Sequence, residues 1–318
     1  MIDASFLSRR QSLAAIASTV VLAACGRGGR DGAVLKVGSQ KGGTKALMLS
    51  SGALDGIAYH VEWSEFPAAQ HLLEAVASGA IDMGLTGDPP FQFAYQSGAP
   101  IKAVSAQLTN PRPREALAIV VPRHSPARTL ADLKGKSIAT TRGSVGHYLA
   151  LRALETAGLP PDHIRFVWLA PGDAKAAFDS GAIDAWSIWV PYLATAQRSG
   201  ARIIADGYGL VQGYGFEVAN ETAIAGKKAL LADFARREAK ALDWAKRHLD
   251  EFSAVLAQET GLPLDIARIT AGRSRRLPVA LDDRLVADQQ IVLQTFVKSG
   301  DIRAPRPLEA AFIDIQAD

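Results

Sequence analysis

Two glycine-rich segments carry the residues of this sequence that could bind an anion. Gly38-Ser39-Gln40-Lys41-Gly42-Gly43 follows an expected strand and opens a helix, and Gly143-Ser144-Val145-Gly146-His147 holds the matching place later in the chain. Such a loop directs backbone N–H groups and the positive end of a helix dipole toward the carboxyl edge of a sheet. Taken singly, each loop is better explained as a simple turn. If both face one cleft, they predict an anion-binding site.

The same segments do not match catalytic or cofactor patterns. The first loop is not G-x-G-x-x-G, and no acidic residue follows in the right context, so a dinucleotide site is not indicated. Ser144 lacks the nucleophile-elbow pattern because Arg142 stands where a glycine is needed, and we interpret Ser144 as a helix N-cap with His147 as a neighbouring donor. The six histidines of the chain are not spaced as metal ligands are; they are His60, His71, His124, His147, His163 and His248. We expect no catalytic residue, no metal and no cofactor.

Aromatic and acidic side chains occur at the ends of other expected strands. Trp186 and Trp189 could form an apolar wall for a ligand, although strand alternation would instead send one to the core and one to the cleft. Asp88, in the string Thr86-Gly87-Asp88-Pro89-Pro90, could accept a hydrogen bond from a ligand amine, cap the next turn or pair with Lys41. The sequence leaves these alternatives open.

The overall charge is nearly balanced. The chain has 35 Lys and Arg against 32 Asp and Glu, a formal net charge of +3, so it lacks the basic surface expected of a nucleic-acid-binding protein. One basic cluster, Arg273-Ser274-Arg275-Arg276, is late in the chain. Such a run favours a solvated face over a functional site.

A repeated phrase suggests how these loops are positioned. Ser78-Gly79-Ala80-Ile81-Asp82 returns 102 positions later as Ser180-Gly181-Ala182-Ile183-Asp184. In each copy the glycine can end a helix, because it adopts the positive φ that a C-cap requires. A strand follows each copy, and parallel sheets bind ligands at the carboxyl ends of their strands. The repeat therefore predicts two similar α/β lobes around a cleft.

Short β-rich runs alternate with helical runs from Val34 onward, which is typical of a mostly parallel sheet covered by helices. The expected strands are 34–39, 59–65, 83–86, 102–106, 118–121, 137–140, 165–169, 185–189, 202–205 and 215–220. The expected helices are 45–51, 69–77, 92–96, 145–157, 174–180, 192–199, 227–259, 264–271 and 282–298. After Thr222 we expect helices only, packed on the first lobe. The chain would then cross between lobes near 118–122 and 216–220, and these segments would form a hinge.

The first 25 residues are predicted to be a signal peptide. Arg9 and Arg10 precede an apolar run of 12 residues, which is too short to span a bilayer. The run ends in Leu22-Ala23-Ala24-Cys25, similar to a lipobox, and Cys25 is the only cysteine, so we expect lipidation there and no disulfide within the chain. The string Ser8–Leu13 resembles a twin-arginine export signal. Removing residues 1–24 leaves 294 residues with a net charge of +2, which is enough for two domains.

Many short motifs, taken together, resemble one family. They are Gln40-Lys41-Gly42, Glu65-Phe66-Pro67, Gly79–Asp82 running into Thr86–Pro90, Ala131–Lys136, Gly143-Ser144 with His147, Leu151–Leu154, and Asp184-Ala185-Trp186 with Ile188-Trp189 and Pro191-Tyr192. In this order and spacing, which cover nearly all of the mature chain, the sequence is similar to the aliphatic sulfonate-binding proteins of bacterial ABC importers and to their nitrate, taurine and thiamine-precursor relatives.

The resemblance implies a type II periplasmic binding protein fold, in which two doubly wound lobes are joined by a two-strand hinge and followed by a helical tail. The first lobe would comprise 33–118 and 221–318, and the second 119–220. The expected function is capture of an aliphatic sulfonate or related small organic anion by lobe closure, without catalysis. The expected partners are an ABC permease and ATPase, and the expected state is a monomer, lipid-anchored in the periplasm.

The resemblance also implies which residues bind the ligand. The sulfonate would lie at the start of the helix that begins at Ser144. Carried over by position, the expected contacts are Gln40, Gly87, Asp88, Ser144, His147 and Trp189. From the loops and strand ends themselves we also expect Lys41, Thr86, Gly143, Trp186 and Glu217 to contact the ligand. Val190 departs from the family's aspartate, and Glu217 could supply the missing carboxylate. This departure keeps open a heterocyclic vitamin precursor, nitrate or taurine as the ligand. An enzyme related to thiamine-pyrimidine synthases is disfavoured by the export leader.

Overall fold

The computed structural model describes residues 32–109 and 113–315. The signal peptide, the twin-arginine string and Cys25 lie outside the described residues, so lipidation and the export route remain predictions. Among the helices within these ranges, none combines the length and apolar character of a membrane span. Within the same ranges, no group of three or more His, Cys, Asp or Glu side chains is placed to hold a metal ion.

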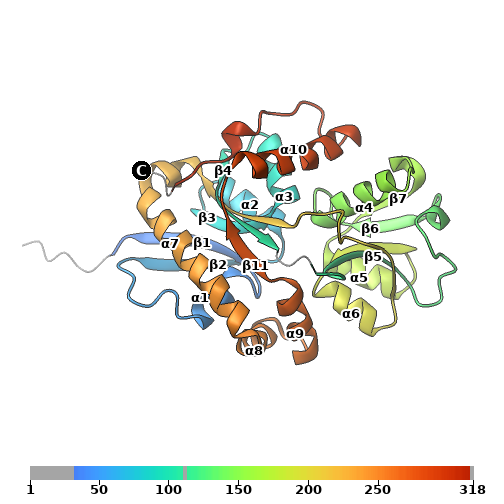
Figure 1. Ribbon diagram of the computed structural model, residues 1–318, viewed down its shortest axis with the longest axis horizontal. Helices are drawn as coiled ribbons and strands as arrows, with labels where there is room; N and C mark the ends of the chain where they lie inside the picture. The colour runs from blue at the N-terminus through green and yellow to red at the C-terminus, as the bar shows by residue number, and fades with distance from the viewer. Residues whose placement is uncertain (1–31, 110–112, 316–318) are drawn as a thin grey trace, which may run out of the picture. The chain divides into compact units, whose positions relative to one another are not determined.

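Two mixed sheets form the framework of the described residues (Figure 1). The larger sheet has the strand order β11-β4-β10-β3-β1-β2 and the smaller β7-β6-β8-β5-β9. The strands of the larger sheet are β1 (Val34–Gln40), β2 (His60–Phe66), β3 (Met83–Gly87), β4 (Ile101–Thr109), β10 (Tyr214–Asn220) and β11 (Arg276–Val279). The strands of the smaller sheet are β5 (Leu117–Val121), β6 (Ser137–Thr140), β7 (Arg165–Trp168), β8 (Ala185–Trp189) and β9 (Arg202–Asp206).

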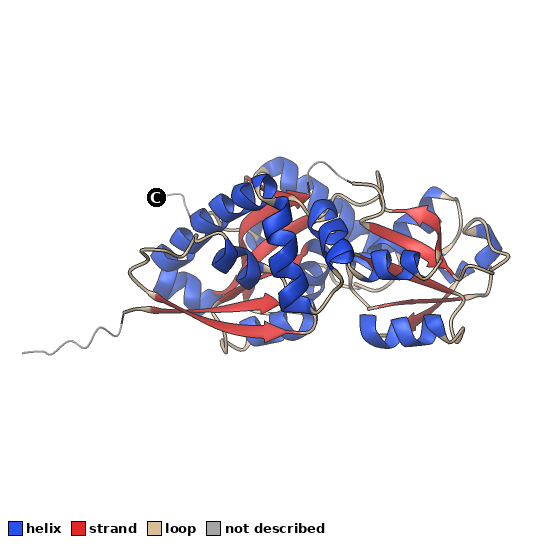
Figure 2. Cartoon of the chain, turned by 90° about the horizontal axis from the view of Figure 1, so that it is seen from below, coloured by secondary structure: helices blue, strands red, loops and turns tan. Residues whose placement is uncertain are grey.

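Helices cover both faces of each sheet (Figure 2). On the larger sheet, one face packs against α2 (Ala69–Ala77), α3 (Asp88–Gln96) and α10 (Asp283–Lys298). The opposite face packs against α1 (Thr44–Ser50) and α7 (Glu221–Arg247). On the smaller sheet, α4 (Val145–Thr156) covers one face, and α5 (Pro171–Asp179) and α6 (Tyr192–Arg198) cover the other. Two further helices, α8 (Leu249–Thr260) and α9 (Leu264–Arg273), pack together. This arrangement confirms the predicted periplasmic binding protein fold with C-terminal helices.

The repeated phrase of the sequence forms equivalent joints in the two sheets. Gly79 and Gly181 follow α2 and α5 with φ of 76° and 75°, as a glycine C-cap requires. The aspartate of each copy then accepts a backbone hydrogen bond from the adjacent parallel strand. Asp82 Oδ2 accepts from the Lys36 N–H at 2.7 Å, and Asp184 Oδ2 accepts from the Ser137 N–H at 2.8 Å. The phrase therefore couples the end of a helix to the register of a neighbouring strand.

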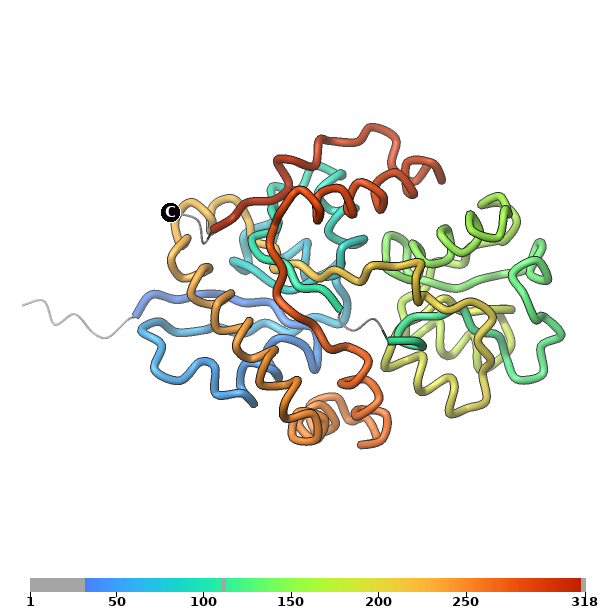
Figure 3. Tube along the Cα trace, viewed as in Figure 1, coloured from blue at the N-terminus to red at the C-terminus, as the bar shows by residue number. Residues whose placement is uncertain are grey.

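The C-terminal tail differs from its prediction, because it contains a strand. Residues 276–279 form β11, which pairs antiparallel with β4 at the edge of the larger sheet. Pro278 is compatible with this place, since an edge strand leaves one row of N–H groups unpaired. Figure 3 shows the chain running from α9 through β11 into α10. The predicted helix 227–259 is also divided, at His248, into α7 and α8.

The chain crosses between the sheets at places other than those predicted. It leaves the larger sheet between Thr109 and Leu117 and returns between Asp206 and Tyr214. The predicted crossings, 118–122 and 216–220, fall largely inside β5 and β10, because both segments are buried and each pairs with a strand on either side.

The tail packs on the larger sheet, as expected, but α10 also reaches α4 of the smaller one. Asp301, just beyond α10, pairs with Arg142 at 3.0 Å, and Lys298 pairs with Glu155 at 2.7 Å. Phe296 of α10 packs edge-on against Phe93 of α3 at a ring separation of 4.7 Å and lies 5.9 Å from the ring of Tyr148 in α4. The C-terminal segment therefore joins the two halves through both apolar and ionic contacts.

Candidate functional site

One cavity of about 660 Å³ is lined by both glycine-rich loops. The larger sheet side contributes the loop after β1, the start of α2 and the end of β3. The smaller sheet side contributes the loop after β6, the start of α5 and the end of β8. The residues of these segments are Gln40–Thr44, Pro67–Gln70, Leu85, Gly87, Pro90, Thr141, Ser144, Val145, Pro171, Lys175 and Trp189–Tyr192. The cavity thus lies at the carboxyl ends of strands from both sheets, as parallel sheets favour.

The loop after β6 presents the start of a twelve-residue helix to this cavity. Gly143 has a φ of 71°, which bends the chain sharply before α4. Ser144 is the N-cap, and its Oγ accepts a hydrogen bond from the His147 N–H at 3.3 Å. Because the first N–H groups of a helix have no partner within the helix, this position favours an anion.

The loop after β1 lies on the opposite side of the cavity. The turn is closed by a hydrogen bond from the Gly43 N–H to the Gln40 carbonyl at 2.8 Å, and Ser39 Oγ accepts from the Lys45 N–H at 3.1 Å. Gln40 and Lys41 line the cavity, and Lys41 is exposed. The structure therefore brings Gln40, Lys41, Gly87, Ser144 and Trp189 to one cavity, out of the eleven expected ligand contacts.

An apolar wall completes the cavity on its outer side. Trp189, at the end of β8, lines it together with side chains from α1 and from the helices of the tail. The apolar side chains from these helices, and from the turn between α8 and α9, are Leu47, Leu242, Ala245, Phe252, Leu256, Leu262 and Ala271. The sequence did not indicate the contribution of the tail, because each of these residues reads as ordinary core in an amphipathic helix.

The charge on the cavity wall has one sign. Lys41, Lys175, Lys246, Arg275 and Arg276 line it, whereas none of the described lining residues is Asp or Glu. Two of these cations belong to the basic cluster that we expected to form a solvated face. Arg273, in contrast, pairs with Glu115 at 2.6 Å. Arg275 is exposed, in agreement with the prediction, although it also lines the cavity. Arg276 differs from the prediction because the pairing of β11 with β4 places it at the cavity wall, which no spacing in the sequence indicates.

Trp186 and His147 lie behind the cavity wall and not on it. Trp186 is 1% exposed and packs between Phe178 and Tyr192, so strand alternation places it in the core and Trp189 at the cavity. His147 is 1% exposed, and its Nδ1 accepts a hydrogen bond from the Gly143 N–H at 3.2 Å. Burial lowers the pKa of His147 to about 4, although the nearby Asp301 acts in the opposite direction. This histidine is neutral at neutral pH and fixes the loop before α4. Gly143, also buried, acts through the same hydrogen bond.

Asp88 and Thr86 are also buried beneath the wall. Asp88 is the first residue of α3, not part of the strand end as we expected, and it is 1% exposed. Its Oδ2 accepts a hydrogen bond from Gln289 Nε2 at 3.3 Å, and it forms no ion pair with Lys41. Burial raises the pKa of Asp88 to about 7. Thr86 is 2% exposed. Neither side chain lines the cavity.

Glu217 does not replace the family aspartate at the cavity. It is fully buried in β10, where its carboxyl group faces that of Glu238 from α7. Burial, followed by the neighbouring carboxyl of Glu238, raises the pKa of Glu217 well above its ordinary value. Glu238 is 2% exposed, and its Oε1 accepts a hydrogen bond from Thr44 Oγ1 at 3.4 Å. The pair is therefore harder to ionise than two separate, solvated carboxyl groups.

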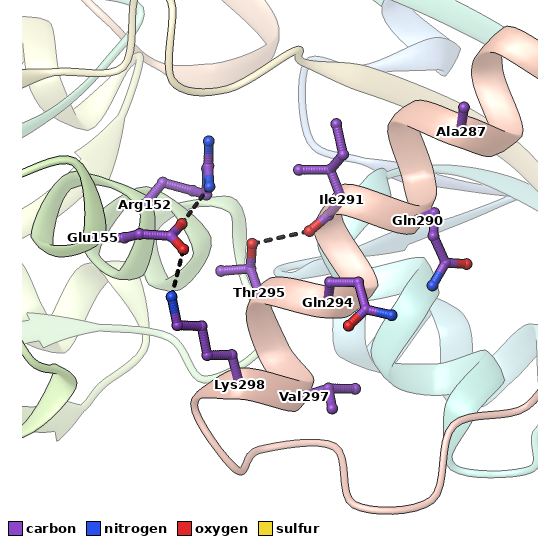
Figure 4. A pocket seen from close by; sticks show the side chains of 9 residues that line it. All are labelled: Arg152, Glu155, Ala287, Gln290, Ile291, Gln294, Thr295, Val297 and Lys298. Atoms are coloured by element: carbon purple, nitrogen blue, oxygen red, sulfur yellow. Dashed lines mark hydrogen bonds and ion pairs between the residues drawn. The ribbon is translucent and has the colours of Figure 1, made fainter.

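A second hollow lies between α4 and α10 (Figure 4). Its ionic side chains satisfy one another, since Glu155 pairs with Arg152 on the same helix and with Lys298 of α10. The remaining lining residues come mostly from one face of α10, including Ile291 and Thr295. Because its charges are paired, this hollow is a contact between helices and not an anion site.

Comparisons with known proteins agree with this geometry. The sequence profile of the family described as "NMT1/THI5 like" matches residues 60–251. A relative from Escherichia coli (strain K12), whose name places it as a candidate among the aliphatic sulfonates-binding proteins, is 39% identical over 240 residues. That match covers 73% of this chain and 73% of the relative.

Two solved structures are similar over most of the chain. The periplasmic aliphatic sulphonate binding protein of Escherichia coli is 31% identical with a TM-score of 0.79, and the match covers 88% of this chain and 92% of that one. The alkanesulfonate-binding protein of Xanthomonas axonopodis pv. citri, solved bound to MOPS, is 31% identical with a TM-score of 0.80. That match covers 89% of this chain and 98% of the other.

Proposed function

Because the chain belongs to the NMT1/THI5-like family, we propose that it is the substrate-binding component of an ABC importer and that it captures an aliphatic sulfonate or a related small organic anion. One observation carries this proposal: the cavity has an apolar wall and five cationic side chains, with no acidic side chain among its described lining residues. A sulfonate combines a permanent negative charge with an apolar body, and a cavity of this composition suits both parts.

The two ends of such a ligand would have different neighbours. Its sulfonate would accept hydrogen bonds near Ser144, where the start of α4 offers unpaired N–H groups, and near Gln40. Its hydrocarbon body would lie against Trp189 and the apolar wall from α7 to α9. Closure of two lobes, one built on the larger sheet and the other on the smaller sheet, would exclude water from both ends.

Binding without catalysis is the activity that these residues support. Ser144 Oγ accepts a hydrogen bond from a backbone N–H, and His147 Nδ1 accepts another, so the two side chains are engaged in the helix cap. His147 is buried and does not line the cavity, so it could not act as a base on a bound ligand. We therefore propose a binding protein and not an enzyme.

The cavity favours a simple sulfonate over the alternatives that the sequence left open. Taurine carries an ammonium group, and an aminopyrimidine carries a ring amine, and each would be stabilised by a carboxylate at the wall. Glu217 and Asp88, the two carboxyls suggested by the sequence, are buried away from it. Nitrate would leave the apolar wall unused.

A thermal-shift screen of the purified protein tests the proposal. The panel contains linear alkanesulfonates, taurine, nitrate and an aminopyrimidine, each with a turnover measurement alongside. An alkanesulfonate at about 100 times its Kd should stabilise the protein by roughly 2.7 kcal/mol. The absence of a shift with every sulfonate would contradict the proposed function, and ligand turnover would contradict the assignment as a binding protein.

We further propose that the protein works as a periplasmic monomer, anchored through lipidated Cys25 after export by a twin-arginine route, and delivers its ligand to a permease and an ATPase. The composition of residues 8–25 supports the anchor and the route. Detergent phase partition of the expressed full chain tests this. The wild type should enter the detergent phase, and Cys25→Ala should remain in the aqueous phase. Equal partition of both would exclude a lipid anchor at Cys25.

A further inference from the structure

The guanidinium group of Arg276 is held in a notch of the larger sheet. Arg276 begins β11, opposite Thr109 of β4, and lines the cavity. In the sheet, β4 lies between β11 and β10, and the guanidinium of Arg276 reaches across β4 to Gly215 of β10. A Cβ on residue 215 would collide with Nη1 of Arg276. Glycine at this position therefore leaves the space that the guanidinium occupies.

This guanidinium has no counter-ion in direct contact. Nη1 is inaccessible to solvent and has no hydrogen-bond partner, and no carboxylate oxygen of the described residues lies within 4.0 Å of the group. The neighbouring Arg273 shows the contrast, since its Nη2 donates to Glu115 at 2.6 Å. A buried cation is costly unless it is paired and hydrogen-bonded. Arg276 thus lacks the partner that its position requires.

The nearest carboxyl groups compensate this charge only in part. Asp88 and Glu238 attract Arg276, but both are buried, and burial raises the pKa of each. Glu238 also faces Glu217, and the two carboxyl groups raise each other's cost of ionisation, as the raised pKa of Glu217 reflects. Neither Asp88 nor Glu238 reaches ion-pair distance of the guanidinium, and the other charged side chains that line the cavity are cations as well.

We propose that the guanidinium of Arg276 binds the anionic group of the ligand, and this inference rests on the proposed function. Negative charge, and not the tetrahedral shape of the ligand's head alone, then becomes a condition for binding. The uncharged N–H donors near Ser144 can hydrogen-bond to either a charged or a neutral head group of the ligand. The guanidinium of Arg276, in contrast, favours an anionic head group because it is positively charged. Arg276 is in this sense the residue that determines charge specificity.

Isothermal titration with two probes of the same shape tests this inference. The probes are 1-octanesulfonate and the uncharged 1-octanesulfonamide. In Arg276→Gln, the affinity for the sulfonate should fall by about 30-fold or more, as for loss of one partner of a buried ion pair. The affinity for the sulfonamide should change by less than about threefold. Arg268→Gln, which removes an exposed cation of α9 that pairs with Asp250 and does not line the cavity, is the matched control and should leave both affinities nearly unchanged.

A second variant moves the charge without removing it. Gly215→Ala keeps Arg276 but places a methyl group in its notch, and the flexible guanidinium must shift. This variant should also lose affinity for the sulfonate selectively, and it serves if Arg276→Gln does not fold.

The possible outcomes separate the inference from the proposed function. An equal loss of both probes in Arg276→Gln would show that Arg276 only supports the structure, and unchanged sulfonate affinity would show that it does not contact the anion. Either result overturns the inference and leaves the proposed function intact. If the wild-type protein binds no sulfonate, the proposed function fails and the inference fails with it.

Discussion

Replacing Asp88 with Asn should make the protein more stable at high pH than at low pH, relative to wild type. Asp88 is 1% exposed, and burial raises its pKa from 3.8 to about 7. Between these two values the folded protein retains the carboxyl proton that the unfolded chain has released. The folded state then binds more protons, so the free energy of unfolding falls as the pH rises through this window.

The size of the effect follows from the pKa difference. A shift of about three units at 1.36 kcal/mol per unit corresponds to about 4 kcal/mol of lost stability, absent below about pH 4 and complete above about pH 7. Asn cannot ionise, and its amide oxygen can still accept the hydrogen bond from Gln289. Asp88→Asn should therefore lack this loss, while all other titrating groups remain common to both proteins.

Urea denaturation followed by tryptophan fluorescence at several values between pH 4 and pH 8 measures the difference. Asp173→Asn is the matched control, because Asp173 also lies in the first turn of a helix but is exposed. Its stability difference from wild type should not vary with pH. Parallel stability profiles for wild type and Asp88→Asn would refute the reasoning that burial keeps this carboxyl protonated.

Three further substitutions probe the cavity and the joints around it. Trp189→Ala should weaken alkanesulfonate binding by about tenfold or more in calorimetry, since it removes an aromatic wall; unchanged affinity would exclude Trp189 as a ligand contact. Gly146→Ala should destabilise the protein by about 1–3 kcal/mol in urea, because its Cβ would lie 2.6 Å from the Ser187 carbonyl oxygen; wild-type stability would show that α4 can move away from β8. Asn220→Ala should cost about 1–2 kcal/mol, since Asn220 caps α7 and donates to the Ile81 carbonyl; no loss would mean that water replaces both bonds.

Most of the fold could be predicted from the sequence because its signals are local. The strands and helices between Val34 and Arg198 were located to within a few residues, apart from the early start of α3, since hydrophobic period and glycine positions report directly on backbone geometry. The repeated Gly79 and Gly181 likewise predicted equivalent helix ends, because positive φ is a property of one residue and its neighbours. Strand β11 was missed, since a proline and an arginine in a four-residue edge strand leave no alternating pattern.

The candidate site was predicted only in part, for a related reason. Gln40, Lys41, Gly87, Ser144 and Trp189 end strands or open helices, and topology brings such residues to one edge of a sheet. Burial separated the others from the cavity. Trp186 and Asp88 are close in sequence to residues that line the cavity, and Glu217 lies in a strand of the larger sheet. All three side chains are nevertheless buried inside the protein.

The sequence by itself determined the class of this protein: two α/β sheets, loops suited to an anion and the resemblance to sulfonate-binding proteins, all carried by short motifs along the chain. Only the tertiary structure decided which charges meet the ligand. Arg276 reaches the cavity because β11 pairs with β4, two segments separated by more than 160 residues, and because Gly215 of a third strand leaves room for its guanidinium. Spacing in a sequence reports on neighbours along the chain, whereas burial and charge compensation depend on segments that meet only after folding.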